Sequence, residues 1–373
     1  MNETKKANRL IIIGNGFDLA HGYKTSYKDF LFHIIFKRLL EFKQTMELGT
    51  YSSYKLPEHI HFRTDLLSPT DFQKFSNQIN SFQEQIKKND VDLFGQLKNF
   101  IKNSGFSIVF PSQLISQIYN DTNLNNWVDV EEACYSLIKS VIYHKSDLKP
   151  NYSELELIRS LNKSLLFLTS ELEQYLSDII FEKFSVQSMV MKFINKDYGT
   201  TYVLNFNYTT TFTQYFEINT NYEIINIHGE LNNKDNPIIF GLGDENHSIY
   251  PQIVESNIDE MLHNVKSLKY LETNNYEALK LAIDKAVFDV DIIGHSCGIS
   301  DRTLLKEVFT HSNCLKVNIH HHNGLASYRQ SVYGVSRYFE NNFDMRQKIK
   351  PFNSELNIPQ IKSVTKQNEL EIA

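Results

Sequence analysis

The segment that most constrains this chain joins a continuous apolar run to a turn rich in glycine. Leu10 to Ile13 is followed at once by Gly14-Asn15-Gly16. A continuous, mostly β-branched run is typical of a central strand covered on both faces of a parallel sheet. The glycines permit positive φ or a close approach of backbone to a ligand. The segment predicts an α/β fold with a ligand-cradling turn; a tight turn without a ligand is the alternative.

The spacing of these glycines does not fit the dinucleotide fingerprint of hydride-transfer enzymes. The third glycine of G-x-G-x-x-G would fall at position 19, which is Leu19. No second parallel strand with a ribose-binding acid follows within the usual unit of about thirty residues. We therefore do not expect a dehydrogenase.

Composition narrows the class of protein further. The chain has 373 residues, 41% of them hydrophobic, which is sufficient for a large core. A net charge of −6 makes nucleic acid and anionic membranes poor partners. Three widely spaced cysteines suit a reducing compartment rather than disulfides or zinc. With no signal peptide and no run of membrane-spanning length, we expect a cytoplasmic protein.

Periodicity along the chain predicts a core that is discontinuous in sequence. A helix is expected over Tyr27–Phe42, capped by Ser26, and residues 70–196 are mostly helical in pattern. Further strands are predicted at Thr201–Phe206, Tyr222–Ile227, Pro237–Phe240, Ala286–Ile293 and Cys314–His320. Helices are predicted at Thr209–Phe216, Asp259–Leu281 and Asp301–Thr310.

These elements predict a three-layer, Rossmann-like α/β fold with a mostly parallel sheet of about six strands. Residues 1–45 and 197–345 would form the core, and residues 46–196 an all-helical insertion or cap. Residues 346–373, rich in Lys, Gln, Glu and Ser towards the end, are expected to be a mobile tail.

Three later strands end, like the first, in small or polar residues. They lead into Asn207, into His228-Gly229 and into Gly294-His295-Ser296. Because the carboxyl ends of parallel strands line the ligand crevice of such sheets, we expect these residues to converge with the first turn.

Asn207 and His228 are the candidates for chemistry. The Asn207 amide could bond a ribose hydroxyl or hold a water, although it or a neighbouring threonine could instead cap a helix. His228 could act as an acid or base near neutral pH, or be a buried structural histidine.

The segment Gly294 to Asp301 offers backbone amides that could hold ribose or phosphate, with Ser300 as a helix cap. Residues 294–298 also match the letters of the G-x-S-x-G nucleophile elbow, but a helix does not follow directly. A serine hydrolase is therefore a minor alternative. The run His320-His321-His322 lacks a completing carboxylate or cysteine at metal-site spacing, so no metal is predicted.

Several segments together resemble the bacterial AbiH family of phage abortive-infection proteins. The similarity extends over about residues 9 to 335. It is carried by residues 11–22 (Ile-Ile-Ile-Gly-Asn-Gly-Phe-Asp-Leu-Ala-His-Gly), Thr25–Phe30, Trp127–Glu131, Phe206–Thr210, Ile227–Gly229 and Gly294–Asp301.

The same order of motifs is distantly similar to the sirtuin-like domains of NAD-consuming phage-defence enzymes. That resemblance implies Asn207 and His228 as catalytic residues. It implies nucleotide contacts from Gly14, Asn15, Gly16, Phe17, Asp18, Gly229, Gly294, His295, Ser296 and Asp301. The chain departs from the pattern at Asn15, where a small residue is usual, at Phe17, where serine or threonine is usual, and at Thr209, which replaces an aspartate. It also lacks a four-cysteine zinc module, which argues against a protein deacetylase.

The resemblance implies a phage-defence protein that hydrolyses NAD at the bond between nicotinamide and ribose. NAD would be the substrate or ligand, a phage-derived factor the trigger, and a homo-oligomer a possible assembly. Two alternatives stay open: a catalytically silent nucleotide sensor that acts through protein contacts, and a nuclease or serine hydrolase.

Overall fold

The computed structural model describes residues 6–48, 57–64, 69–121, 127–143, 153–179, 198–213, 222–243 and 245–360. The chain forms two compact units. The described residues of the first lie within positions 6–25 and 176–360, and those of the second within positions 26–175. The strand-end residues all belong to the first unit.

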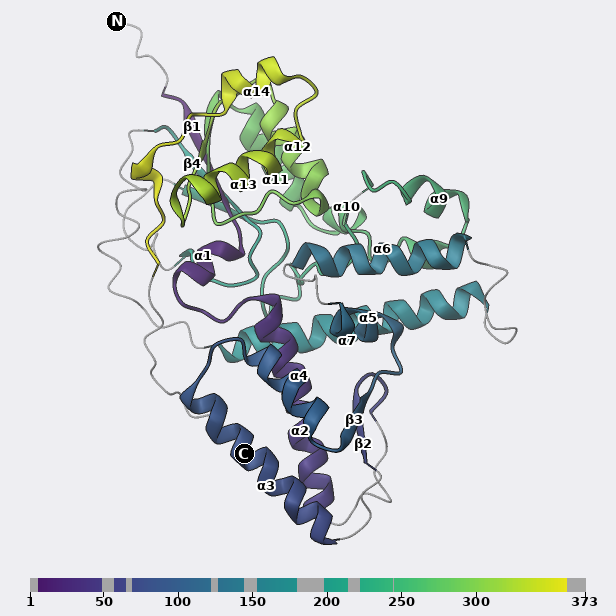
Figure 1. Cartoon of the computed structure of the whole chain (residues 1–373). Helices are drawn as coiled ribbons and strands as arrows, with labels where there is room; N and C mark the ends of the chain where they lie inside the picture. The colour runs from purple at the N-terminus through teal and green to yellow at the C-terminus, as the bar shows by residue number, and fades with distance from the viewer. Residues whose placement is uncertain are drawn as a thin grey trace, which may run out of the picture. The chain divides into compact units, whose positions relative to one another are not determined.

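The first unit is built on a parallel five-stranded sheet (Figure 1). Its strands are β1 (Asn8–Ile13), β4 (Thr201–Asn205), β5 (Tyr222–Asn226), β6 (Phe288–Ile293) and β7 (Cys314–Ile319). The order β5-β4-β1-β6-β7 makes β1 the central strand, and every residue of β1 is buried. The predicted parallel α/β architecture and the central position of the first strand are confirmed.

The connection after β1 leads to β4, and the connection after β6 leads to β7. These two connections run in opposite directions across the sheet. The adjacent carboxyl ends of β1 and β6 are therefore the point at which the winding of the sheet reverses. In open α/β sheets this switch point is where ligands bind.

The described sheet has five strands rather than about six, because Pro237–Phe240 is irregular. The segment makes one backbone bond to the loop after β5, from Ile239 N–H to His228 O at 2.7 Å, and no ladder. Pro237 has no N–H to contribute to a ladder. Ile238, Ile239 and Phe240 are nevertheless buried, within an irregular segment.

The two faces of the sheet are covered differently. Leu10, Ile12 and Val290 belong to the larger apolar core. That face carries α11 (Asn275–Asp284), α12 (Arg302–Thr310) and α13 (Gly324–Ser336), which lie close together in Figure 1. On the other face Ile11 and Ile13 pack with Phe17 of α1 (Asn15–Ala20) in a smaller core.

The long connection between β5 and β6 is broken into short pieces. They are α9 (Tyr250–Glu255), η5 (Asp259–Met261), α10 (Lys266–Lys269) and η6 (Tyr270–Glu272), before α11. The continuous helix expected over Asp259–Leu281 is wrong. Around residue 264 the backbone bonds to another segment instead: Leu242 N–H donates to Asn264 O and Lys266 N–H to Leu242 O.

The described C-terminal residues after α13 include α14 (Asn342–Lys348) and η8 (Ser354–Leu356). Lys350 N–H donates to Val317 O of β7, and Ile358 is buried in the smaller core. Ile349, Lys350 and Ile358 of the expected tail thus contact the sheet, and residues 361–373 lie outside the described part.

The second unit is mainly helical. It contains α2 (Tyr27–Glu47), α3 (Pro69–Lys88), α4 (Leu93–Asn103), α5 (Gln113–Asn120), α6 (Trp127–Tyr143) and most of α7 (Glu154–Asp178). The predicted Ser26 cap is confirmed as a capping box with Asp29.

The insertion is not all-helical as expected, since β2 (His61–Thr64) and β3 (Phe106–Val109) form an antiparallel pair. Periodicity did not reveal these strands because each has only four residues. None of the described helices is long and apolar enough to cross a membrane.

Candidate functional site

The ends of four strands meet at the carboxyl edge of the sheet. The Asn207 Nδ2 group, just after β4, donates to the Gly14 carbonyl after β1 at 3.1 Å. Gly16 N–H donates to the Gly294 carbonyl after β6 at 2.8 Å. His228 follows β5 and packs edge-on against the ring of Phe206, 4.9 Å between ring centres. The structure therefore brings together residues more than 190 positions apart.

The glycines are required because two turns pack backbone against backbone. A Cβ atom on Gly16 would lie 2.7 Å from the Gly294 carbonyl oxygen, and one on Gly14 would lie 2.6 Å from His295 Cα. Gly294 has φ +70°, and its Cβ would lie 2.2 Å from Phe17 N. Within this contact Gly14 N–H donates to Ile293 O and Phe17 N–H to Gly14 O. Close approach of the two turns explains these three glycines.

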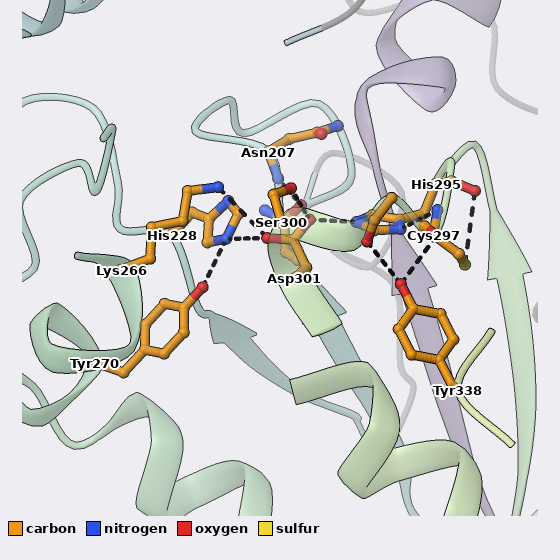
Figure 2. A network of polar contacts seen from close by, with 11 residues as sticks. Asn207, His228, Lys266, Tyr270, His295, Cys297, Ser300, Asp301 and Tyr338 are labelled. Atoms are coloured by element: carbon orange, nitrogen blue, oxygen red, sulfur yellow. Dashed lines mark hydrogen bonds and ion pairs between the residues drawn. The ribbon is translucent and has the colours of Figure 1, made fainter. Parts of the chain in front are cut away.

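Asp301 lies at the centre of a buried polar cluster (Figure 2). Its Oδ1 atom is 3.2 Å from His228 Nε2 and 3.4 Å from Lys266 Nζ. Its Oδ2 atom is 3.7 Å from His295 Nε2. His228 Nε2 is also 3.1 Å from the Tyr270 hydroxyl. Figure 2 shows His228, Lys266 and Tyr270 on one side of Asp301 and His295 on the other.

The charges of the cluster follow from burial and from these neighbours. Burial favours the neutral form of Asp301, but Lys266 and the two imidazoles outweigh it and hold the pKa of Asp301 well below its usual range. Burial, assisted by Lys266, lowers the pKa of His228. Burial lowers the pKa of His295 to about 4, with Asp301 opposing the shift. At neutral pH the carboxylate is charged and both imidazoles are neutral.

The second ring nitrogen of His295 fixes its tautomer. Cys297 N–H donates to His295 Nδ1 at 3.0 Å, so we assign the proton of the neutral ring to Nε2, facing Asp301. Cys297 has φ +51°, and its carbonyl and that of Gly298 are both within reach of the Tyr338 hydroxyl, at 2.9 and 2.6 Å. The loop after β6 is thus fixed by the His295 ring and by the Tyr338 hydroxyl.

Asn207 presents an acceptor atom at this edge. Its Nδ2 donates to Gly14 O and its backbone N–H to Asn205 Oδ1, whereas its Oδ1 has no hydrogen-bond partner in the described part of the chain. Residues 209–213 form turns, and the remainder of the helix predicted at Thr209–Phe216 lies outside the described residues. An amide oxygen in this position can orient a water or a hydroxyl.

Asp18 lies in a separate buried contact with the loop after β4. Thr209 Oγ1 donates to Asp18 Oδ2 at 2.7 Å, and Thr211 Oγ1 is 3.2 Å from Thr209 Oγ1. Asp18 Oδ1 is buried, and none of the described residues donates a hydrogen bond to it. Burial raises the pKa of Asp18 to about 6, against the polar side chains of Thr209, Thr211 and Asn207, which lower it.

The other predicted binding residues do not enter the Asp301 cluster. The Asn15 side chain bonds Thr25 twice, at 2.6 and 3.0 Å, and Phe17 packs on Phe212. Gly229 has φ +87°, and a Cβ there would meet the Pro237 carbonyl. Ser296 is exposed. In the described structure it has no hydrogen bond to His295, whose two ring nitrogens face Cys297 N–H and Asp301 Oδ2.

Two members of the cluster, Lys266 and Tyr270, were missed by the sequence analysis. Both come from the connection between β5 and β6. No sequence signal marks Lys266, because lysines in helical patterns are usually exposed. Only the long-range fold makes it a buried residue of the site.

The histidine run has structural contacts. His320 Nε2 is 2.9 Å from Asp291 Oδ1, and His321 Nε2 is 3.0 Å from the Asn353 carbonyl. Among the described residues, no group of three or more His, Cys, Asp or Glu side chains is arranged to hold a metal ion.

Comparison with known proteins identifies one family. A family model described as bacteriophage abortive infection AbiH matches residues 10–322. Comparisons with curated proteins and with solved structures give no match. The matched range contains the four strand ends and the whole Asp301 cluster, whereas the resemblance to sirtuin-like domains rests on the sequence motifs alone.

Proposed function

The chain belongs to the bacteriophage abortive infection AbiH family, and on this premise we propose that it is a phage-defence protein that hydrolyses NAD, or a related nucleotide, at the edge of its parallel sheet. The bond broken would be that between nicotinamide and ribose. Loss of NAD would stop growth of an infected cell. A phage-derived trigger and a homo-oligomer are part of the same prediction.

One observation carries the proposal. Asn207, His228 and Asp301 gather beside the carboxyl ends of β1 and β6, where the winding of the sheet reverses. A ligand crevice is expected at this place in an open α/β sheet. The residues there supply an amide oxygen, a neutral imidazole and a carboxylate.

These groups suit cleavage of a bond whose leaving group is already cationic. The reaction needs stabilisation of an oxocarbenium-like ribose and a positioned water. We assign the water or a ribose hydroxyl to Asn207 Oδ1 and the acceptance of a proton to His228. Asp301, first expected to bind ribose, would orient His228, because its Oδ1 lies 3.2 Å from His228 Nε2.

The test is incubation of the purified protein with NAD, followed by chromatography for nicotinamide and ADP-ribose. Asn207→Ala and His228→Ala should each lower the rate about 100-fold or more. His311→Ala is the matched control, since this imidazole pairs with Asp284 outside the cluster. Absence of nicotinamide release even with phage components present would overturn hydrolysis.

A nucleotide sensor without catalysis is the second candidate. It is favoured by the closed hydrogen bonding of the cluster, in which His228 and Asp301 are 6% and 7% exposed and bond to each other and to Tyr270 or Lys266. Mass spectrometry of nucleotide that co-purifies with the protein separates the two candidates. An intact dinucleotide that stays uncut, with binding lost in Asn207→Ala, would identify a sensor.

A further inference from the structure

The connection between β5 and β6 inserts a lysine into the polar cluster. Lys266, the first residue of α10, is 3% exposed. Its backbone N–H lies 3.2 Å from the carbonyl oxygens of Leu242 and Gly243. The lysine is therefore held by the fold of the connection itself.

The Lys266 ammonium and the two histidines face the same carboxylate. Lys266 Nζ is 3.4 Å from Asp301 Oδ1, the oxygen that also contacts His228. The other oxygen faces His295 Nε2 at 3.7 Å and Ser300 Oγ at 3.4 Å. The Asp301 carboxylate thus contacts one ammonium group and two imidazole rings.

Two further titratable groups face His228 from neighbouring elements. The Tyr270 hydroxyl of η6 is 3.1 Å from His228 Nε2. The Tyr208 ring, in the loop after β4, lies 6.4 Å from the imidazole between ring centres, and its hydroxyl donates to Ile239 O. Each phenol takes part as a hydroxyl that donates or accepts a hydrogen bond. The charge around His228 is therefore decided by Lys266, Asp301 and His295.

The charge balance of this buried group depends on Lys266. Ammonium and carboxylate cancel, so a proton on either imidazole would add an uncompensated positive charge to a site shielded from water. Without the ammonium, the carboxylate would need a cationic partner. An adjacent imidazole would then take up a proton.

We propose that Lys266 is a positioning residue, which holds the Asp301 carboxylate between the two histidines and keeps His228 unprotonated and able to accept a proton. The consequence for catalysis rests on the proposed function. The electrostatic role of Lys266 does not, and it can be measured without any substrate.

The test is a proton NMR titration of the histidine rings in the full-length protein between pH 3.5 and 8.5. Signals are assigned with His228→Gln and His295→Gln. In Lys266→Met the titration midpoint of His228 or His295 should rise by about one pH unit or more, and Lys266→Arg should behave like the unmodified protein. The matched control is Lys269→Met in the same helix, where the lysine pairs only with Glu272 among the described carboxylates.

Midpoints in Lys266→Met that equal those in Lys269→Met would overturn the proposal. If Lys266→Met does not fold, Asp301→Asn is compared with Lys266→Met/Asp301→Asn, in which no buried carboxylate is left unpaired. Removal of the ammonium should again raise the midpoints, because its direct repulsion of the imidazolium is lost. Equal midpoints in that pair would contradict the role of Lys266.

The outcome is independent of the NAD assay. Raised midpoints with no nicotinamide release would refute hydrolysis and leave the role of Lys266 intact. Nicotinamide release with unchanged midpoints would support hydrolysis and refute the role of Lys266. If the protein hydrolyses NAD, the acid limb of its pH–rate profile should move to higher pH in Lys266→Met, by the same amount as the midpoint of His228.

Discussion

At the residue scale, Asp18 shows how strongly local surroundings can change a side chain. It is 1% exposed, and its Oδ1 has no hydrogen-bond partner in the part of the chain that the structure describes. The bond from Thr209 to Oδ2 compensates only part of the lost hydration. Burial therefore prevails and raises the pKa of Asp18 to about 6. The folded protein binds this proton more tightly than the unfolded chain.

The pH dependence of stability follows from that sign. The contribution of Asp18 is fully favourable below the unfolded-state pKa of 3.8 and is lost as the pH rises through about 6. Asp18→Asn removes the charge and should stabilise the fold at pH 8 by up to about 3 kcal/mol, with little gain at pH 4. Urea unfolding at the two pH values measures the difference. An equal change in the free energy of unfolding at both pH values would show that the charge of Asp18 does not cause the effect.

At the element scale, an ion pair and a histidine tie three neighbouring strands together. Arg9 Nε of β1 is 2.6 Å from Asp291 Oδ2 of β6, and His320, which follows β7, bonds the other oxygen of Asp291. The Arg9, Asp291 and His320 side chains are at most 1% exposed. Charges this deeply buried are tolerated only while they remain paired.

Removal of one partner should therefore cost more than removal of both. Arg9→Met leaves the Asp291 carboxylate without its guanidinium and should destabilise the protein by about 3–5 kcal/mol. Arg9→Met/Asp291→Asn should recover most of that loss, since no buried charge remains. Denaturant unfolding of the single and double variants tests this. A double variant as unstable as Arg9→Met would mean that packing, and not charge, dominates.

At the scale of the whole molecule, each of the two units has its own buried interior. In the first, Leu304 of α12 is buried in the larger core of the sheet. In the second, Phe42, Phe62, Phe75 and Phe106 pack edge to face or tilted, with ring centres 4.6–5.8 Å apart. Units with separate cores can unfold separately.

We expect calorimetry to show two transitions that respond to different substitutions. Leu304→Ala should reduce the free energy of unfolding of the first unit, and Phe75→Ala that of the second, each by about 2–5 kcal/mol, because each leaves a cavity in one core. The midpoint temperature of the corresponding transition should fall. A conservative Leu304→Met serves as a control with a small effect. A single transition lowered equally by both alanine variants would contradict separate unfolding.

The sequence by itself determined the five strands to within two residues at either end, the parallel sheet and the Ser26 cap. Each depends on a local pattern: continuous apolar runs such as Leu10–Ile13 are buried as central strands, and strand ends carry the turns. The shared edge of Gly14, Asn207, His228 and Gly294 followed from the parallel arrangement of those strands.

Only the tertiary structure decided which polar groups are buried together. The cluster requires Lys266 beside Asp301, 35 residues away, and the central ion pair joins residues 282 positions apart. The irregular Pro237–Phe240 and the broken helix around Asn264 arise in the same way, since backbone bonds to distant segments replace the local pattern. Periodicity reports which residues avoid water, whereas the charge state and role of a site depend on neighbours that only the folded chain brings into contact.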